Sequence, residues 1–347
     1  MKLMRYLPAF ILSLVCIQAS ANNTIDTFGI GKDQLFCHKV ADKTESNRKL
    51  IIYLHGGVSQ FKGLTESVVT DVESLLEGNE AFVEQCQKRG FDLALPVSFN
   101  QYNWLEADGY SFLVVVTSYY RQFYDSIYMA GFSDGGTGAY RIFYSLHKEF
   151  KGLMVFNGYP QLKGYHRGVE YSNINKPVVF CSTTKDGVIP SEFLQVEYRR
   201  QQMLNKNTFF VMRDGKHAFT AYGKDDIDLC LDLLMSHDNS SEIPEDSVHI
   251  YPPIDGLIID GRLVEVHPFK KGIGKSYGMS ESEYARSDID HKRLEKLLKK
   301  GIAIRVEPIV VSKKEFEDAD TLQFILSIDG AETRFNLVNW HQVNPWN

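Results

Sequence analysis

The sequence predicts a doubly wound α/β domain with a mostly parallel sheet, followed by a smaller C-terminal α+β module. Short apolar runs alternate with longer amphipathic stretches from about residue 34 to residue 236. Several of these runs are continuous Val, Ile, Leu and Phe without polar alternation, which is typical of strands covered on both faces. Alternation of such strands with helices indicates a largely parallel sheet.

Each element of the first domain follows from this pattern. The expected strands are Leu35–Val40, Lys49–Leu54, Phe91–Pro96, Ser126–Ala130, Gly152–Phe156, Pro177–Cys181 and Thr208–Met212. The expected helices are Leu64–Leu76, Ala81–Arg89, Tyr110–Tyr124, Thr137–Lys148, Ser191–Leu204 and Asp225–Met235. Together they make up the α/β domain, which we place at residues 22–237.

The pattern changes after residues 238–247, which are polar, acidic and contain a proline, so we expect a linker there. In the module that follows, residues 248–347, Asp260-Gly261 and Asp329-Gly330 each separate two apolar runs. Such dipeptides indicate two-residue hairpin turns. A helix over roughly Glu283–Lys299 and a strand over Ile302–Val311 complete the expected elements.

Composition excludes several classes of protein. The chain has 347 residues, of which 44% are hydrophobic and 24% charged, and its formal net charge is −6. These values exclude a disordered tail, a collagen-like fibre and a polytopic membrane protein. An acidic balance offers no electrostatic footprint for nucleic acid, so we expect no nucleic-acid partner.

The first 21 residues have the pattern of a secretory signal peptide. Lys2 and Arg5 form a charged start, residues 7–17 are almost wholly apolar, and Ala19-Ser20-Ala21 is a small-x-small cleavage site. The apolar stretch is too short to span a bilayer. We therefore expect cleavage after Ala21 and a secreted or periplasmic mature chain without a membrane span. Lipid attachment at Cys16 is the alternative.

Cysteine usage agrees with export but leaves the redox state open. Four cysteines remain after the expected cleavage, namely Cys37, Cys86, Cys181 and Cys230. An even number permits two disulfides in an oxidising compartment, in any of three pairings. Buried free thiols are an equally good interpretation.

The strongest chemical signal is Gly131-Phe132-Ser133-Asp134-Gly135, a G-x-S-x-G sequence. An expected strand leads directly into it and an expected helix follows it. This is the setting of a nucleophile elbow, a strained turn that exposes a serine above the sheet. We therefore expect Ser133 to be a nucleophile.

A second signal is His55-Gly56-Gly57, which ends the buried strand at Lys49–Leu54. Backbone N–H groups at such a strand end supply one half of an oxyanion hole, and the residue after the nucleophile supplies the other. We expect the N–H groups of Gly57 and Asp134 in these roles. A plain strand-to-helix turn is the alternative for His55-Gly56-Gly57.

An acid and a histidine follow the next two strands. Asp186 comes after Pro177–Cys181, and His217 comes after Thr208–Met212. Singly, these residues are typical of a turn and of a protein surface. In the chain order Ser, Asp, His, at strand ends, they predict a catalytic triad with Ser133. Asp214 and Asp225 are weaker candidates for the acid.

Residues 34–236 resemble secreted α/β-hydrolases of the serine esterase type. They are similar to small esterases, dienelactone hydrolases, polyester depolymerases and the catalytic domain of prolyl-oligopeptidase-like enzymes. This resemblance implies that Ser133 is the nucleophile, His217 the general base and then acid, and Asp186 the orienting carboxylate. It implies no metal and no organic cofactor.

We therefore expect an exported serine hydrolase that cleaves carboxylic esters of a small molecule or a polymer, with a non-catalytic accessory module. A peptidase of the prolyl-oligopeptidase type and a non-catalytic binding protein on the same fold are the alternatives. Tyr102, Trp104 and Tyr159 lie in segments that follow strand ends, where ligands bind in this fold. Their rings are expected either to line a substrate pocket or to anchor their loops by packing.

Overall fold

The computed structural model describes most of the α/β domain and the regular elements of the C-terminal module. The described residues are 17–19, 23–41, 49–57, 72–98, 102–159, 169–170, 175–205, 207–236, 247–250, 256–259, 262–266, 286–287, 290–307, 309–319 and 321–338. Apart from residues 17–19, the predicted signal peptide lies outside this part of the chain, and so do residues 238–246 of the predicted linker.

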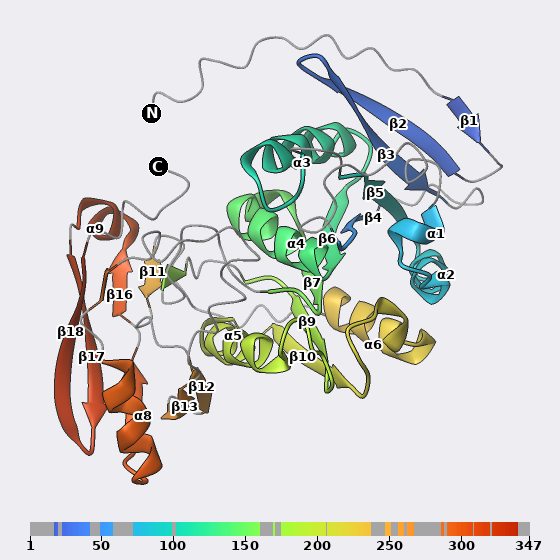
Figure 1. Ribbon diagram of the computed structural model, residues 1–347. Helices are drawn as coiled ribbons and strands as arrows, with labels where there is room; N and C mark the ends of the chain where they lie inside the picture. Colours follow the sequence, from blue (N-terminus) through green and yellow to red (C-terminus); the bar gives the residue numbers. More distant parts are fainter. Residues whose placement is uncertain are drawn as a thin grey trace.

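The α/β domain contains one large sheet whose centre is parallel, as the sequence predicts (Figure 1). Within the described residues its strand order is β1-β2-β3-β5-β4-β6-β7-β9-β10. The strands from β5 to β10 pair in parallel, whereas β1, β2 and β3 form an antiparallel edge. The carboxyl ends of the parallel strands therefore lie along one rim of the sheet, where they bring loop residues together.

Most elements of this domain lie close to their expected positions. Of the expected helix Leu64–Leu76, residues 64–71 lie outside the described residues and the structure has a helix over Val72–Leu75. Its strands are β1 (Ile17–Ala19), β2 (Asn23–Ile30), β3 (Asp33–Val40), β4 (Lys49–Leu54), β5 (Phe91–Pro96), β6 (Ser126–Phe132), β7 (Leu153–Phe156), β8 (Val169–Glu170), β9 (Val178–Thr183) and β10 (Thr208–Arg213). Its helices are α1 (Val72–Leu75), α2 (Glu80–Lys88), α3 (Ala107–Tyr120), α4 (Asp134–Ser145), α5 (Ser191–Leu204) and α6 (Lys224–Met235), with short 3-10 turns η2 (His147–Glu149) and η3 (Phe219–Ala221).

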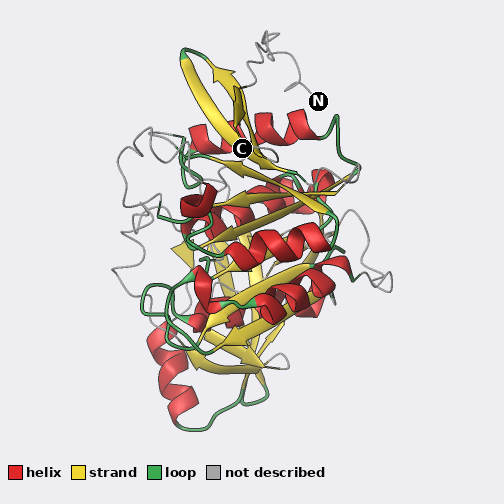
Figure 2. Cartoon of the chain, turned by 90° about the vertical axis from the view of Figure 1, so that its right-hand side faces the viewer, coloured by secondary structure: helices red, strands yellow, loops and turns green. Residues whose placement is uncertain are grey.

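Helices cover both faces of the sheet, and each face has its own core (Figure 2). Side chains of α3, α4 and α5 pack in one cluster, and side chains of α1, α2 and α6 pack in the other. Alternate residues of β4 divide between the two clusters, so that Ile52 joins the first and Ile51 and Tyr53 join the second. Burial on both faces explains why these strands read as unbroken apolar runs.

The sequence patterns did not predict β2, which pairs antiparallel with β3 along its whole length. Half of its residues are polar, and those buried are Asp26 and Phe28. Asp26 is accommodated because the Tyr120 hydroxyl donates a hydrogen bond to its carboxylate at 2.7 Å. A strand near the edge of the sheet with so few buried side chains carries too weak an apolar signal to be found from the sequence.

The C-terminal module has the mostly antiparallel sheet that the sequence predicts, in the strand order β12-β13-β15-β17-β18-β14. Both expected hairpins pair as predicted, and in the second Asp329 and Gly330 have φ values of 50° and 78°. Positive φ at both turn residues makes this a type I′ turn. The strands are β11 (Ser247–Ile250), β12 (Gly256–Ile259), β13 (Arg262–Val266), β14 (Arg286–Ser287), β15 (Ile304–Glu307), β16 (Ile309–Ser312), β17 (Thr321–Ile328) and β18 (Ala331–Val338).

Two expectations for this module need correction. Helix α8 (His291–Lys299) begins later than expected, because the Asp290 side chain caps it and Arg286–Ser287 pair with β18 instead. The expected strand Ile302–Val311 is divided into β15 and β16, which belong to different sheets. The division falls at Pro308, which has no N–H to donate to a continuous ladder. A further helix, α9 (Lys313–Asp318), was not predicted.

A second small sheet joins the two parts of the chain. In it β11 pairs antiparallel with β16 of the module on one side and with β8 of the α/β domain on the other. Leu322 and Phe324 of β17 are also buried in the same core cluster as the side chains of α3, α4 and α5. The module is therefore packed into the α/β domain, beside α5, as Figure 1 shows.

The four cysteines are all buried and unbridged in this structure. The sulfur atoms of Cys181 and Cys230 lie 3.4 Å apart, between β9 and α6. No helix of the described residues is long and apolar enough to cross a membrane.

Candidate active site

Ser133 occupies the sharp turn between β6 and α4, with φ 56° and ψ −122°. A non-glycine residue rarely adopts positive φ, and the turn persists because the flanking glycines allow close packing. A Cβ on Gly131 would lie 2.3 Å from the carbonyl oxygen of Gly135, and a Cβ on Gly135 would lie 1.9 Å from that of Leu54. The two glycines of the motif are thus required by the close approach of β6, α4 and β4.

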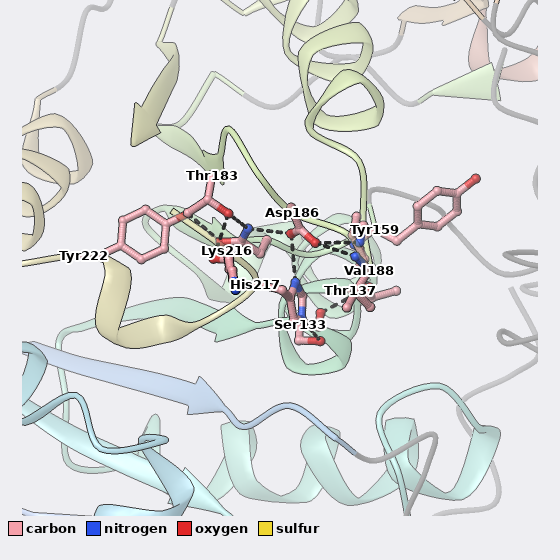
Figure 3. Close-up of polar contacts among 11 residues, drawn as sticks. Ser133, Thr137, Tyr159, Thr183, Asp186, Val188, Lys216, His217 and Tyr222 are labelled. Atoms are coloured by element: carbon pink, nitrogen blue, oxygen red, sulfur yellow. Dashed lines mark hydrogen bonds and ion pairs between the residues drawn. The ribbon is translucent and has the colours of Figure 1, made fainter. Parts of the chain in front are cut away.

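The structure brings Ser133, His217 and Asp186 together from three strand ends (Figure 3). The distance from His217 Nε2 to Ser133 Oγ is 2.8 Å, and that from His217 Nδ1 to Asp186 Oδ2 is also 2.8 Å. An ionised carboxylate accepts hydrogen bonds, so Nδ1 carries the proton and Nε2 accepts one from the serine. Strand, elbow and helix, with Ser, Asp and His in this chain order, form the α/β-hydrolase arrangement.

The Asp186 carboxylate is held by several donors. Its Oδ1 accepts the backbone N–H groups of Val188 and Ile189, each at 2.8 Å, and its Oδ2 also accepts the Asn157 side-chain amide at 2.6 Å. Burial raises the pKa of this carboxyl. The hydrogen bonds from His217, Asn157 and Ile189 together lower it by more, so the pKa of Asp186 lies below the ordinary value. Asp186 is therefore a fixed anion beside the histidine.

Asn157 is a site residue that the sequence reasoning missed. It is fully buried with a φ of 46°, and its amide also donates to Thr183 Oγ1 at 2.8 Å. Its Oδ1 accepts the hydroxyl of Tyr222, and Thr183 Oγ1 donates to the carbonyl of Lys216. Asn157 follows directly after β7, so the rule that found Asp186, a polar residue at a strand end, could also have found it.

The segment that carries His217 packs on an aromatic cluster below the site. The rings of Phe132 and His217 are 4.9 Å apart, and Phe219 lies against Phe132 and Tyr53 at 5.5 Å and 5.3 Å. Aromatic contacts of this kind fix ring orientation as well as burying area. The His217 ring is therefore held on one side by packing against Phe132 and at Nδ1 by the hydrogen bond to Asp186.

The predicted oxyanion turn lies at the end of β4, beside Ser133. His55 Nε2 accepts the backbone N–H of Ser98 at 3.1 Å, and its Nδ1 lies 2.9 Å from the carbonyl oxygen of Gly56. This pattern requires a neutral ring with the proton on Nδ1. Burial lowers the pKa of His55 to about 4, which agrees with that assignment. His55 therefore braces the turn and does not face the reacting atoms.

The two expected oxyanion donors sit where backbone N–H groups can converge. Gly57 follows β4 with a φ of 75°, a conformation that favours glycine. Asp134 is the first residue of α4, so its N–H lies in the first turn of that helix, where negative charge is favoured. The neighbouring Gly56 N–H, in contrast, donates to the Glu77 carboxylate at 3.1 Å.

The three aromatic residues proposed for a pocket are buried. The indole N–H of Trp104 donates to the carbonyl of His55 at 2.9 Å, and the hydroxyl of Tyr102 donates to Asp33 at 2.9 Å. The backbone N–H of Tyr159 donates to Thr137 at 2.8 Å, and its ring points away from the triad in Figure 3. In this structure their contacts are those of loop anchors, with Trp104 and Tyr159 each 1% exposed.

The weaker acid candidates lie apart from the histidine's partners. Asp214 is exposed and accepts hydrogen bonds from Thr184 and Lys185, at 2.7 and 2.9 Å, and Asp225 is exposed in the first turn of α6. No group of three or more His, Cys, Asp or Glu side chains in the described ranges is arranged to hold a metal ion.

No family model matches the chain. No curated protein matches it either. Among solved structures it is similar to Est1E from Butyrivibrio proteoclasticus, with 14% identity and a TM-score of 0.46 over 61% of this chain and 99% of that one. The Pyrococcus furiosus esterase Pf2001 has 18% identity and a TM-score of 0.45, over 66% of this chain and 94% of that one. An acylaminoacyl peptidase of Pyrococcus horikoshii has 12% identity and a TM-score of 0.44, over 67% of this chain and 43% of that one.

Proposed function

We propose that the chain is an exported serine hydrolase that cleaves carboxylic esters of small molecules or polymers through an acyl-enzyme. The observation that carries the proposal is the unbroken hydrogen-bond chain from Ser133 through His217 to Asp186, with the serine on a strained elbow. A serine hydroxyl is a poor nucleophile at neutral pH, and a neutral imidazole at hydrogen-bond distance is what activates it.

In the first half-reaction Ser133 Oγ attacks the ester carbonyl carbon while its proton passes to His217 Nε2. Asp186 stabilises the imidazolium that forms and keeps the ring in the correct orientation. The carbonyl oxygen becomes an oxyanion, which the N–H groups of Gly57 and Asp134 stabilise. The intermediate then collapses, and the departing alkoxide takes the proton from Nε2 and leaves as the alcohol.

The second half-reaction hydrolyses the acyl-enzyme. A water molecule gives its proton to His217 Nε2 as its oxygen attacks the acyl carbon. Collapse of this second intermediate breaks the bond to Ser133 Oγ, which recovers the proton from the imidazolium. The carboxylic acid is released and the resting hydrogen-bond chain is restored.

The test is a substrate panel with matched serine variants. Purified protein is assayed with p-nitrophenyl acetate and butyrate and with aminoacyl p-nitroanilides, beside Ser133→Ala and Ser111→Ala. Ser111 is an exposed serine of α3, and its hydroxyl bonds only to its own helix at Ala107, so its variant controls for the loss of a hydroxyl. Ser133→Ala should lower ester turnover by at least about 10⁴-fold, whereas Ser111→Ala should leave it unchanged.

The outcomes separate the alternative functions. Preference for the anilides would indicate a peptidase, and a folded protein that turns over neither substrate class would indicate a binding protein. A fluorophosphonate probe that labels a residue other than Ser133 would overturn the assignment of the nucleophile. For export, the expected result is a chain recovered outside the cytoplasm that begins at Asn22, which removes β1 and leaves the β2–β3 pairing intact.

A further inference from the structure

Glu77 lies beside the nucleophile although it belongs to neither the triad nor the predicted oxyanion donors. Its Oε1 accepts the backbone N–H of Gly56 at 3.1 Å. The position that a Cβ on Gly56 would occupy is 2.6 Å from Glu77 Oε1 and 3.0 Å from the Cβ of Ser133. The carboxylate and the nucleophile therefore sit next to each other across the Gly56 backbone.

The turn that carries Glu77 is fixed by its own backbone. Glu77 has a φ of 51° and is followed by Gly78 at 74°. The N–H of Glu77 donates to the carbonyl of Ser74 at 3.1 Å, and that of Gly78 donates to Glu73 at 3.0 Å. Positive φ is unfavourable for a residue such as glutamate, and it persists only where the surroundings determine it.

The same turn is tied to the segment that carries the catalytic histidine. The side-chain amide of Asn79, itself 3% exposed, donates to the carbonyls of Phe219 and Tyr222 at 2.8 and 3.2 Å. Its Oδ1 accepts the N–H of Phe82 at the start of α2. Glu77 is therefore held between the oxyanion turn and the His217 segment.

We propose that Glu77 is a positioning residue for the oxyanion turn. By holding the Gly56 N–H, its carboxylate directs the following Gly57 N–H towards the carbonyl oxygen of the substrate. Two successive glycines have little conformational preference of their own, so an external acceptor is needed to select one orientation. This inference rests on the proposed function, because it assigns Glu77 a role in the same oxyanion hole.

The charge on Glu77 adds to this role. The titratable groups of the described residues that face it are His217, Asp134 and Tyr53. Partial burial raises the pKa of the Glu77 carboxyl to about 6, although the residue as a whole is exposed. Hydrogen bonds to an ionised acceptor are roughly twice as strong as those to a neutral one. Above pH 6 the turn is therefore held more firmly than below it.

The test compares Glu77→Ala and Glu77→Gln with the same two changes at Glu80, an exposed carboxylate in the first turn of α2. The readouts are ester turnover and the rate at which a fluorophosphonate labels Ser133, each measured at saturation. Glu77→Ala should lower both maximal rates at least about tenfold, less than the ~10²–10³ cost of deleting an oxyanion donor. The half-saturating concentrations should change little, because the hole acts on the transition state.

Glu77→Gln keeps an acceptor for Gly56 but cannot ionise, so it should retain about a third of the wild-type rate at pH 8. The ratio of wild-type to Glu77→Gln rates should fall from about threefold at pH 8 to about one at pH 5. Expressing the result as a ratio removes the pH effects that the two proteins share. The Glu80 variants should match the wild type throughout, and unfolding midpoints should agree among all five proteins.

Several results would overturn the inference. The first is a Glu77→Ala variant whose maximal rate equals that of the wild type. The second is an equal loss of maximal rate in Glu77→Ala and Glu77→Gln. The third is a ratio of wild-type to Glu77→Gln rates that does not depend on pH. A wild-type protein that is labelled at Ser133 but hydrolyses no ester would overturn the proposed function alone, because the labelling series would still measure the effect of Glu77. Absence of labelling at Ser133 in the wild type would overturn both.

Discussion

The neutral, buried His55 makes a quantitative prediction about stability in acid. Its pKa is lowered from 6.5 to about 4, chiefly by burial. As pH falls below 6.5 the unfolded chain takes up a proton on this residue while the folded protein does not, so folding becomes less favourable. The difference corresponds to at most about 3 kcal/mol in the free energy of unfolding, of which about 2 kcal/mol is lost between pH 7 and pH 5.

Urea unfolding of the wild type and of His55→Gln at both pH values isolates this effect. The glutamine amide can accept the Ser98 N–H but does not titrate, so all other ionisable groups cancel in the difference between the two proteins. The wild type should lose about 2 kcal/mol of its advantage over the variant on going from pH 7 to pH 5. A difference that stays constant with pH would refute the neutral assignment of His55.

Two further predictions concern packing and the support of the triad. Gly135→Ala should lower the free energy of unfolding by at least about 3 kcal/mol, because its Cβ would overlap the Leu54 carbonyl, and urea unfolding measures this. Gly29→Ala has no atom within 4 Å of its Cβ and should cost nothing; equal effects at the two sites would contradict the packing argument. Asn157→Ala removes a hydrogen bond to the Asp186 carboxylate and should lower kcat for ester hydrolysis about tenfold, and an unchanged kcat would show that Asp186 needs no such support.

Much of the fold could be predicted because the central strands have a simple environment. Lys49–Leu54 and Phe91–Pro96 are buried on both faces, so an apolar run and its ends mark the strand completely. The elements that were not predicted depend on pairing with other strands, and their own local sequence gives no sign of that pairing. Arg286–Ser287 forms a strand because β18 lies beside it, and β2 is a strand because β3 pairs with it.

The candidate site likewise contains residues that the sequence predicts and residues that it does not. Ser133, Asp186 and His217 each follow a strand of the parallel part of the sheet. Parallel strands bring their carboxyl ends to one rim, so the chain order of the three residues was informative. Glu77 follows a helix and reaches the site through a left-handed turn, for which its neighbours give no periodic signal. The rings of Tyr102 and Trp104 could not be assigned to a pocket or to packing from the sequence, because both roles use the same residue types.

The small β8–β11–β16 sheet has a consequence for how the protein is made. Strand β8 acquires its partner only once residues 247–250 exist, and those residues in turn pair with residues 309–312. Leu322 and Phe324, which belong to the same core cluster as side chains of α3, α4 and α5, are synthesised later still. Because the ribosome works from the N-terminus, the strands that precede Ser133 and His217 emerge before Leu322 and Phe324. Completion of this core cluster is thus among the last events of synthesis.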